Sequence, residues 1–246
     1  MLAIFKKEIN QFFSSVTGYV AIILFLLANG LLLFVFPDTS LLDAGYANLD
    51  PLFNLAPLIY LLLIPAITMR CFADEFKTGT MELLSTKPLT GWQIVMGKFW
   101  GSLLIVVISL VPTIVYYVAI RQLSVDAQQL DNGGIIGSYT GLLLLGAAFT
   151  AIGIWSSSLT ANAMIAFLIA LFTCFIFYNG FDAISKIPAL SGGADYYLQM
   201  AGIKFHYTSV SRGVIDSRDI IYFISVIALM LYLTKLSLQR RLWQNG

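Results

Sequence analysis

The chain has 246 residues, of which 59% are hydrophobic and only 11% are charged, and its formal net charge is +1. Soluble domains carry about 25% charged residues, so this composition indicates a membrane protein. The small net charge excludes the basic footprint of a nucleic-acid-binding protein. The two cysteines, Cys71 and Cys174, form neither a disulfide framework nor a metal site and are interpreted as packing residues.

Long apolar runs recur along the chain, and crossing a bilayer takes about 20 helical residues. Continuous runs, rather than ten-residue alternation, favour helices over a barrel. No Asp, Glu, His or Arg lies in the core of any run, although Lys98 lies near one end. We therefore predict an all-α integral membrane protein that forms a single transmembrane domain over residues 1–246. Its six transmembrane helices are expected at residues 16–36, 52–69, 95–120, 135–155, 161–181 and 220–238.

The orientation follows from the basic residues, which gather on the cytoplasmic side of membrane proteins. Placing both termini in the cytoplasm puts most basic residues inside and most acidic residues outside. The basic residues inside are then Lys6, Lys7, Arg70, Lys77, Lys87, Lys98, Lys235, Arg240 and Arg241. This bias favours a multi-pass membrane protein with both termini cytoplasmic.

Residues 2–16 precede the first span and have an amphipathic pattern. Apolar residues such as Phe5, Ile9 and Phe12 recur at helical spacing, while Lys6 and Lys7 take the other face. This pattern predicts an interfacial helix in the headgroup layer. It either anchors the first span alone or also contacts a partner, and the sequence leaves both options open.

A charged segment at residues 70–94 lies between the second and third spans. Thr90 and Gln93 match a capping box, which predicts a helix from Gly91 into the third span. Pro88 interrupts the chain just before, so residues 79–86 are expected to form a separate short helix. The alternative is a solvated connector, but Met81, Leu83 and Leu84 argue against it.

Small residues follow one face of the fourth and fifth spans, where they let helix backbones approach closely. Packing within the chain is the favoured interpretation, and a dimer contact is the alternative. The residues concerned are Gly137, Gly141, Gly146, Ala163, Ala166 and Ala170. The turn between these spans, residues 156–162, is uncharged and lies on the predicted inner side, where Ser158 or Thr160 could cap the fifth helix.

The last outer loop, residues 182–219, is the only sizeable one, and its aromatic residues predict one or two interfacial helices on the outer surface. It contains the only histidine, His206, for which a structural role is favoured over a metal site because no second ligand is evident. The chain also lacks intramembrane carboxylate pairs for an ion relay. The string from Gly91 to Phe99 is no phosphate loop, because it has five residues between its glycines and Phe in place of Ser or Thr.

The segment from Glu75 to Lys98 resembles the signature of type-2 ABC transporter permeases. It contains a Gly-Thr-x-Glu-x-Leu stretch from Gly79, then Pro88, then Gly97-Lys98 at the start of the third span. The six-span plan and the amphipathic start are similar as well. Residues 205–219 resemble the branch of this family that is associated with gliding motility in Bacteroidota, although related segments occur in copper- and nitrous-oxide-related permeases.

The resemblance implies that residues 79–86 are a cytoplasmic coupling helix that docks on a soluble ATP-binding subunit. Apolar and polar contacts to that subunit would come from Glu75, Lys77, Gly79, Thr80, Met81, Glu82, Leu83, Leu84 and Pro88. A second cytoplasmic contact would come from Ser157, Ser158, Thr160 and Asn162. ATP and Mg²⁺ would be bound by the partner, so the chain itself would be no enzyme and hold no cofactor. The family also suggests a second membrane subunit with a large outer domain.

Three functions are therefore weighed. The favoured one is a permease that converts a partner's ATP hydrolysis into rearrangement of its spans, for export or for force transmission. The second is a membrane scaffold or anchor for an outer-side protein complex, with residues 79–86 as a passive connector. The third, a membrane enzyme or secondary transporter, needs charged or nucleophilic groups facing a cavity, and the sequence offers none.

Overall fold

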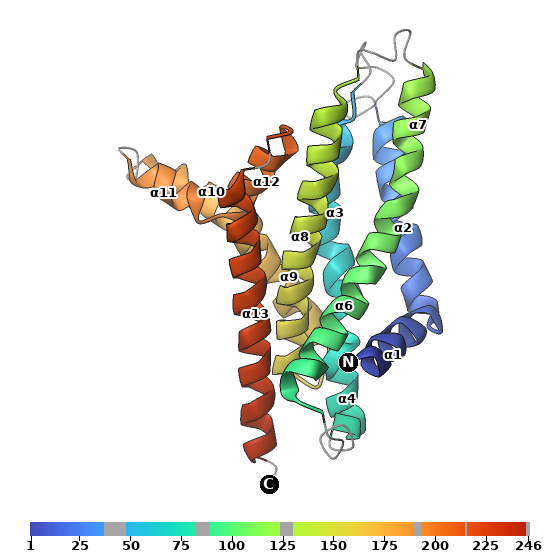
Figure 1. Cartoon of the computed structure of the whole chain (residues 1–246), viewed down its shortest axis with the longest axis vertical. Coiled ribbons are helices and arrows are strands. Elements are labelled where there is room, and N and C mark those ends of the chain that lie inside the picture. Colours follow the sequence, from blue (N-terminus) through green and yellow to red (C-terminus); the bar gives the residue numbers. More distant parts are fainter. Residues whose placement is uncertain (37–47, 82–88, 124–129, 189–192, 215, 245–246) are drawn as a thin grey trace.

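A computed structural model describes residues 1–36, 48–81, 89–123, 130–188, 193–214 and 216–244, and all regular elements in these ranges are helices. The long helices form a bundle (Figure 1). α4 and the C-terminus lie at its lower end in this view, which we call the α4 end. α7 and the start of α8 lie at the upper end, which we call the α7 end.

Five helical segments are long and apolar enough to cross a membrane: Asp50–Thr78, Gly91–Gln122, Asn132–Leu159, Ala163–Ser185 and Ser217–Arg241. α1 (Leu2–Phe13) and α2 (Val16–Phe34) meet at a bend of 69° and add a sixth if they count as one broken span. Ser15 begins α2, since its hydroxyl accepts a hydrogen bond from the Gly18 amide at 3.2 Å. The described residues thus support five spans, or up to six.

The second span is longer than its apolar run. α3 (Asp50–Thr68) passes through Met69 into α4 (Arg70–Thr78), and the helix continues although α4 carries several charges. Pro57 and Pro65 lie inside α3 without ending it. α4 ends at Gly79, whose φ of 71° is a left-handed conformation that favours glycine. The first part of the charged segment is therefore a rigid extension of the second span.

The third span is built from three consecutive pieces. α6 (Gly91–Leu110) begins with the predicted capping box, and both the Thr90 and the Gln93 hydrogen bonds are present. Pro112 then lies in a short 3-10 turn, η2 (Val111–Thr113), before α7 (Ile114–Leu123) continues. Because proline lacks an amide hydrogen, this turn interrupts the regular α-helical hydrogen bonding of the span.

α8 (Asn132–Leu159) lies at the centre of the bundle and contacts α3, α6, α9 and α13. Its glycines allow close approach. A Cβ on Gly137 would lie 2.7 Å from the Gly213 Cα, and one on Gly146 would lie 3.1 Å from a Val106 methyl group. Gly141 faces the Tyr207 ring. On α9 (Ala163–Phe175), Ala166 and Ala170 are fully buried, and Ala163 is half-buried.

The fifth span continues beyond α9, and shorter helices follow it. A π-helical turn, η4 (Ile176–Gly180), leads into α10 (Phe181–Ser185) and α11 (Ala194–Met200), which project sideways from the bundle (Figure 1). α12 (Ile203–Ser211) returns to pack on α8, and the Tyr207 hydroxyl donates to the Phe53 carbonyl at 2.6 Å. α13 (Ser217–Gln244) closes the bundle.

His206 holds these last helices together. Its Nε2 lies 2.8 Å from the Met200 carbonyl, and its Nδ1 lies 2.7 Å from the Asp219 carboxylate. The imidazole is buried and stacks on the Tyr222 ring at 3.9 Å. The histidine therefore joins α11, α12 and α13.

Candidate functional site at the α4 end

Two glycines of α6 make room for α1. A Cβ on Gly97 would lie 3.0 Å from the Ile4 Cβ, and a Cβ on Gly101 would lie 2.9 Å from the Glu8 Cβ. Larger side chains at either position would push α1 away from α6. This close packing brings Glu8 of α1 next to Lys98, which lies between the two glycines in the sequence.

The ammonium group of Lys98 is fully buried, and its hydrogen bonds are complete. It donates to the Glu8 Oε1 at 2.6 Å, the Glu75 Oε1 at 2.9 Å and the Cys71 carbonyl at 2.5 Å. An ammonium has three donors, so none is left unpaired. The Phe72 ring adds a cation–π contact at 4.8 Å.

Lys7 completes a charge-balanced group of two bases and two acids. Its ammonium lies 2.6 Å from the same Glu75 oxygen that accepts from Lys98, and it is partly exposed. We call Lys7, Glu8, Glu75 and Lys98 the charge cluster. A buried charge is costly unless it is paired and hydrogen-bonded. The cluster therefore ties α1, α4 and α6 into one unit.

A serine of α8 fixes the junction between α3 and α4. The Ser157 hydroxyl accepts from the Phe72 and Ala73 amides at 2.9 and 3.2 Å, and it donates to the Met69 carbonyl at 2.9 Å. One donor and two acceptors are all that a hydroxyl offers. The Arg241 guanidinium of α13 covers the Phe76 ring at 4.4 Å and donates to the Leu159 carbonyl. A displacement of α4 would thus also move α8 and α13.

The structure separates the residues that the resemblance assigns to ATPase contact. Glu75 is buried in the charge cluster, and Met81 is buried at 6% exposure. Lys77 and Gly79 are exposed, and Thr80 is half-buried next to Thr78, with 3.0 Å between their hydroxyl oxygens. The remaining expected contacts, Glu82, Leu83, Leu84 and Pro88, lie outside the described residues.

The turn that was expected to form the second cytoplasmic contact is shorter than the predicted residues 156–162. α8 continues to Leu159, so Ser157 and Ser158 are buried within it, whereas Thr160 is half-buried and Asn162 is exposed. The helix cap of α9 is Asn162, whose side chain accepts from the Met164 amide at 2.9 Å, rather than Ser158 or Thr160. Ser158 lies inside α8, too far back to cap α9, and its hydroxyl donates to the Trp155 carbonyl.

The sequence interpretation did not predict the charge cluster. It placed Lys98 at the end of a span and Glu75 on a docking surface, and it assigned no role to Glu8. One signal was available: an ionisable side chain at the edge of an apolar span needs a partner. Glu8 is the only acid in α1. Pairing these two residues, which are 90 positions apart, required the fold.

The cluster has the properties of a mechanical connection. Its groups are paired with one another, and within the described ranges no three His, Cys, Asp or Glu side chains are placed to hold a metal ion. What the arrangement can do is transmit a displacement of α4 to α1 and α6 through short, buried ionic contacts.

The fold and the site define a multi-pass helical membrane protein in which α1, α4 and α6 are joined at the α4 end by the charge cluster. The chain belongs to the ABC-2 family of transporter proteins, which it matches over residues 2–196. This match bears out the resemblance at the level of the family, and the matched range includes the charge cluster and α8. No curated protein is similar enough to the chain to count as a match.

Proposed function

We propose that this chain is the permease subunit of an ABC transporter, driven from its α4 end by a separate ATP-binding subunit. ATP and Mg²⁺ would be held by that partner. The observation that carries the proposal is the unbroken helical path Asp50–Thr78, which ends at exposed Lys77 and Gly79 and is joined to α6 and α1 by the charge cluster. Membership of the ABC-2 family supports it.

The proposed mechanism starts with the partner moving residues 79–86 as it binds and releases ATP. Because α4 continues α3, the displacement reaches the second span directly. Lys98 passes it to the third span, and Glu8 passes it to α1. A partner shifts such an equilibrium only as far as it distinguishes the two states, so its contact with residues 79–86 must differ between its ATP-bound and ATP-free forms.

We further propose that the α4 end is cytoplasmic and that the protein lies in a bacterial inner membrane, as the distribution of basic residues favours. The likeness of residues 205–219 to the gliding-motility branch supports a role in that machinery. A second membrane subunit with a large outer domain would then meet the α7 end.

Reversing a charge in the expected docking helix tests the proposal. Glu82→Lys should abolish co-purification of the ATP-binding subunit in mild detergent, with mass spectrometry of the captured chains as the measurement. Asp216→Lys, at an exposed position at the α7 end, is the matched control and should leave capture unchanged. Full capture by Glu82→Lys would instead favour residues 79–86 as a passive connector.

A further inference from the structure

A groove on the bundle surface lies between the third span and α8, towards the α7 end. It has a volume of about 520 Å³, which is within the range of about 300–1,000 Å³ for ligand sites. Its lining is apolar apart from Tyr117, Asn132 and Tyr139. The apolar lining residues are Val107, Leu110, Val111, Ile114, Ile135, Ile136 and Leu143.

The backbone explains why the groove exists. A 3-10 turn interrupts the third span at Pro112, and this span diverges from α8 towards the α7 end (Figure 1). α7 is held towards α2 instead, where the Tyr116 hydroxyl donates to the Leu26 carbonyl at 3.3 Å. Tyr139 of α8 fills the space beside the turn and donates to the Thr113 carbonyl at 3.1 Å. The groove therefore follows from this divergence.

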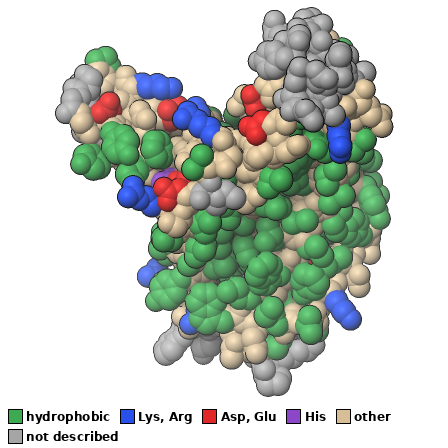
Figure 2. All heavy atoms as spheres, turned by 45° about the horizontal axis from the view of Figure 1, so that its top comes forward, with side chains coloured by type: hydrophobic (Ala, Val, Ile, Leu, Met, Phe, Trp, Pro, Cys, Tyr) green, Lys and Arg blue, Asp and Glu red, His purple; other side chains and the backbone are tan. Residues whose placement is uncertain are grey.

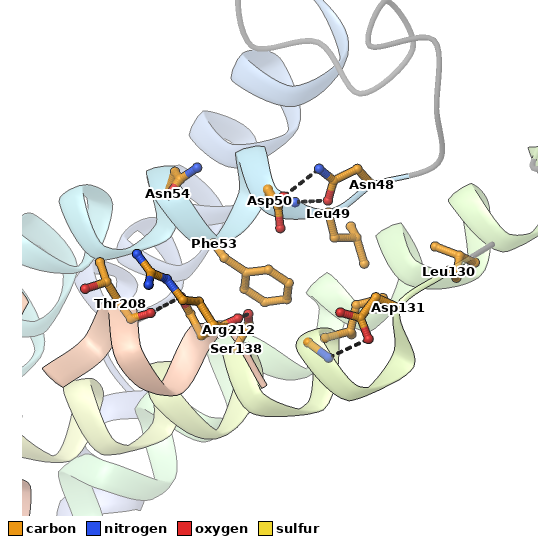
Figure 3. Close-up of a pocket in the computed structure, with 13 residues that line it drawn as sticks. Asn48, Leu49, Asp50, Phe53, Asn54, Leu130, Asp131, Ser138, Thr208 and Arg212 are labelled. Carbon is orange, nitrogen blue, oxygen red and sulfur yellow. Dashed lines mark hydrogen bonds between the residues drawn. The ribbon is translucent and has the colours of Figure 1, made fainter. Parts of the chain in front are cut away.

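The polar end of the groove is at the α7 end of the bundle. There the Tyr117 hydroxyl donates to the Asn132 side chain at 2.9 Å, bridging the two walls. Beyond it, Ile135 also lines a second, polar pocket of about 620 Å³ between α3, α8 and α12. Figure 3 shows Asp50, Asp131 and Arg212 around this pocket, with the Phe53 ring in the middle of them in this view.

The apolar groove lies along the spans, and the polar pocket lies next to it at the end of the bundle. A membrane lipid has the same order, with apolar acyl chains followed by a polar headgroup. Groove residues such as Val111 (54% exposed) and Ile136 (65% exposed) need an apolar covering. Figure 2 shows that apolar side chains cover the bundle face, with charges near its margins. Two carboxylates and one guanidinium line the pocket, so it repels an anionic headgroup more than a zwitterionic one.

We propose that the groove between α6–α7 and α8 binds one acyl chain of a phospholipid with an amine-bearing headgroup, and that the ammonium lies near Asp131. This inference does not depend on the ATPase partnership. Asp131 already caps α8 by accepting from the Gly134 amide at 3.0 Å, so its carboxylate is held in place in the polar pocket, next in sequence to Asn132 of the groove. An ammonium there would bond to a fixed acceptor.

The test uses the full-length protein in vesicles of equal parts phosphatidylethanolamine and phosphatidylglycerol. A trace of phosphatidylethanolamine carries a diazirine on one acyl chain, and mass spectrometry locates the cross-links. We expect labelling to concentrate on residues 107–117 and 132–143. Leu143→Trp, which fills the groove, should lower it several-fold, and Ile136→Trp should do the same if the first variant folds poorly.

Leu168→Trp is the matched control, because Leu168 is a half-exposed apolar residue on α9 outside the groove. It should leave groove labelling unchanged. Labelling spread evenly over α8 and α9, or cross-links from the groove to a helix of another protein, would overturn the lipid site.

A separate measurement tests whether the lipid ammonium lies near Asp131. Asp131→Asn removes the charge but keeps a good helix cap. The ratio of labelling by phosphatidylethanolamine to labelling by phosphatidylglycerol with the same diazirine chain should exceed one in the unaltered protein and fall several-fold towards one in the variant. An unchanged ratio would overturn the assignment of the ammonium to Asp131.

Discussion

Lys98 is the residue on which the α4 end depends most. Replacing it with Met leaves Glu8 buried without the base that pairs with it, and leaves Glu75 with only the partly exposed Lys7. Removing one partner of a buried ion pair costs about 3–5 kcal/mol. We therefore expect Lys98→Met to lower the free energy of unfolding by about that amount, measured by thermal or denaturant unfolding in detergent.

A double variant separates lost charge pairing from lost packing. Glu8→Gln with Lys98→Met removes one acid and one base and leaves Glu75 paired with Lys7. It should recover much of the stability lost in Lys98→Met. A single variant as stable as the original protein would show that the cluster does not hold these helices together.

His206 gives a second prediction at this scale. His206→Phe keeps an aromatic ring against Tyr222 but leaves the Asp219 carboxylate buried without its partner. An unsatisfied buried group costs about 1–3 kcal/mol of stability. Thermal unfolding should show this loss, whereas Lys186→Ala, which breaks an exposed ion pair with Asp182, should change little. Equal effects of the two variants would contradict the role of His206.

At the scale of elements, α1 is predicted to act with the bundle because it is locked onto α6. Gly101→Leu would place side-chain atoms where the Glu8 Cβ now lies, at 2.9 Å from the position of a new Cβ. Overpacking of this kind costs about 1–3 kcal/mol. We expect α1 to detach and become sensitive to limited proteolysis.

Gly91→Ala is the matched control for Gly101→Leu. A Cβ on Gly91 meets only the Lys235 side chain at 3.9 Å, which is an ordinary contact. Protease resistance of α1 should therefore be unchanged by Gly91→Ala. Undiminished resistance in Gly101→Leu as well would show that α1 is held by the lipid layer and not by α6.

Sequence patterns within a few residues predicted most helices. They could not predict which residues far apart in the chain would pair. The Thr90–Gln93 capping box was predicted because its partners are three residues apart. The extension of the second span into α4 was not, since charged residues obscured the inward-facing Cys71, Phe72 and Glu75. Periodicity likewise could not show that Ser157 would bridge the junction of α3 and α4.

At the scale of the whole molecule, composition and hydropathy were sufficient for a helical membrane bundle. Composition and hydropathy did not determine how the helices are arranged in the bundle. The central position of α8 follows from glycines that meet α3, α6 and α12, and their contacts become known only with the fold. All of α12 and α13 and most of α11 lie beyond residues 2–196, so the family match gives almost no information on the helices joined by His206.

Force from the ATP-binding subunit is expected to enter the bundle at the α4 end only. A photo-cross-linking amino acid at exposed Lys77, at the α4 end, is compared with one at exposed Arg212, at the α7 end, in membranes that contain the ATP-binding subunit. Cross-links to that subunit are expected from position 77 alone, and their yield should change when ATP is added. Cross-links from position 212, or none from position 77, would contradict the account.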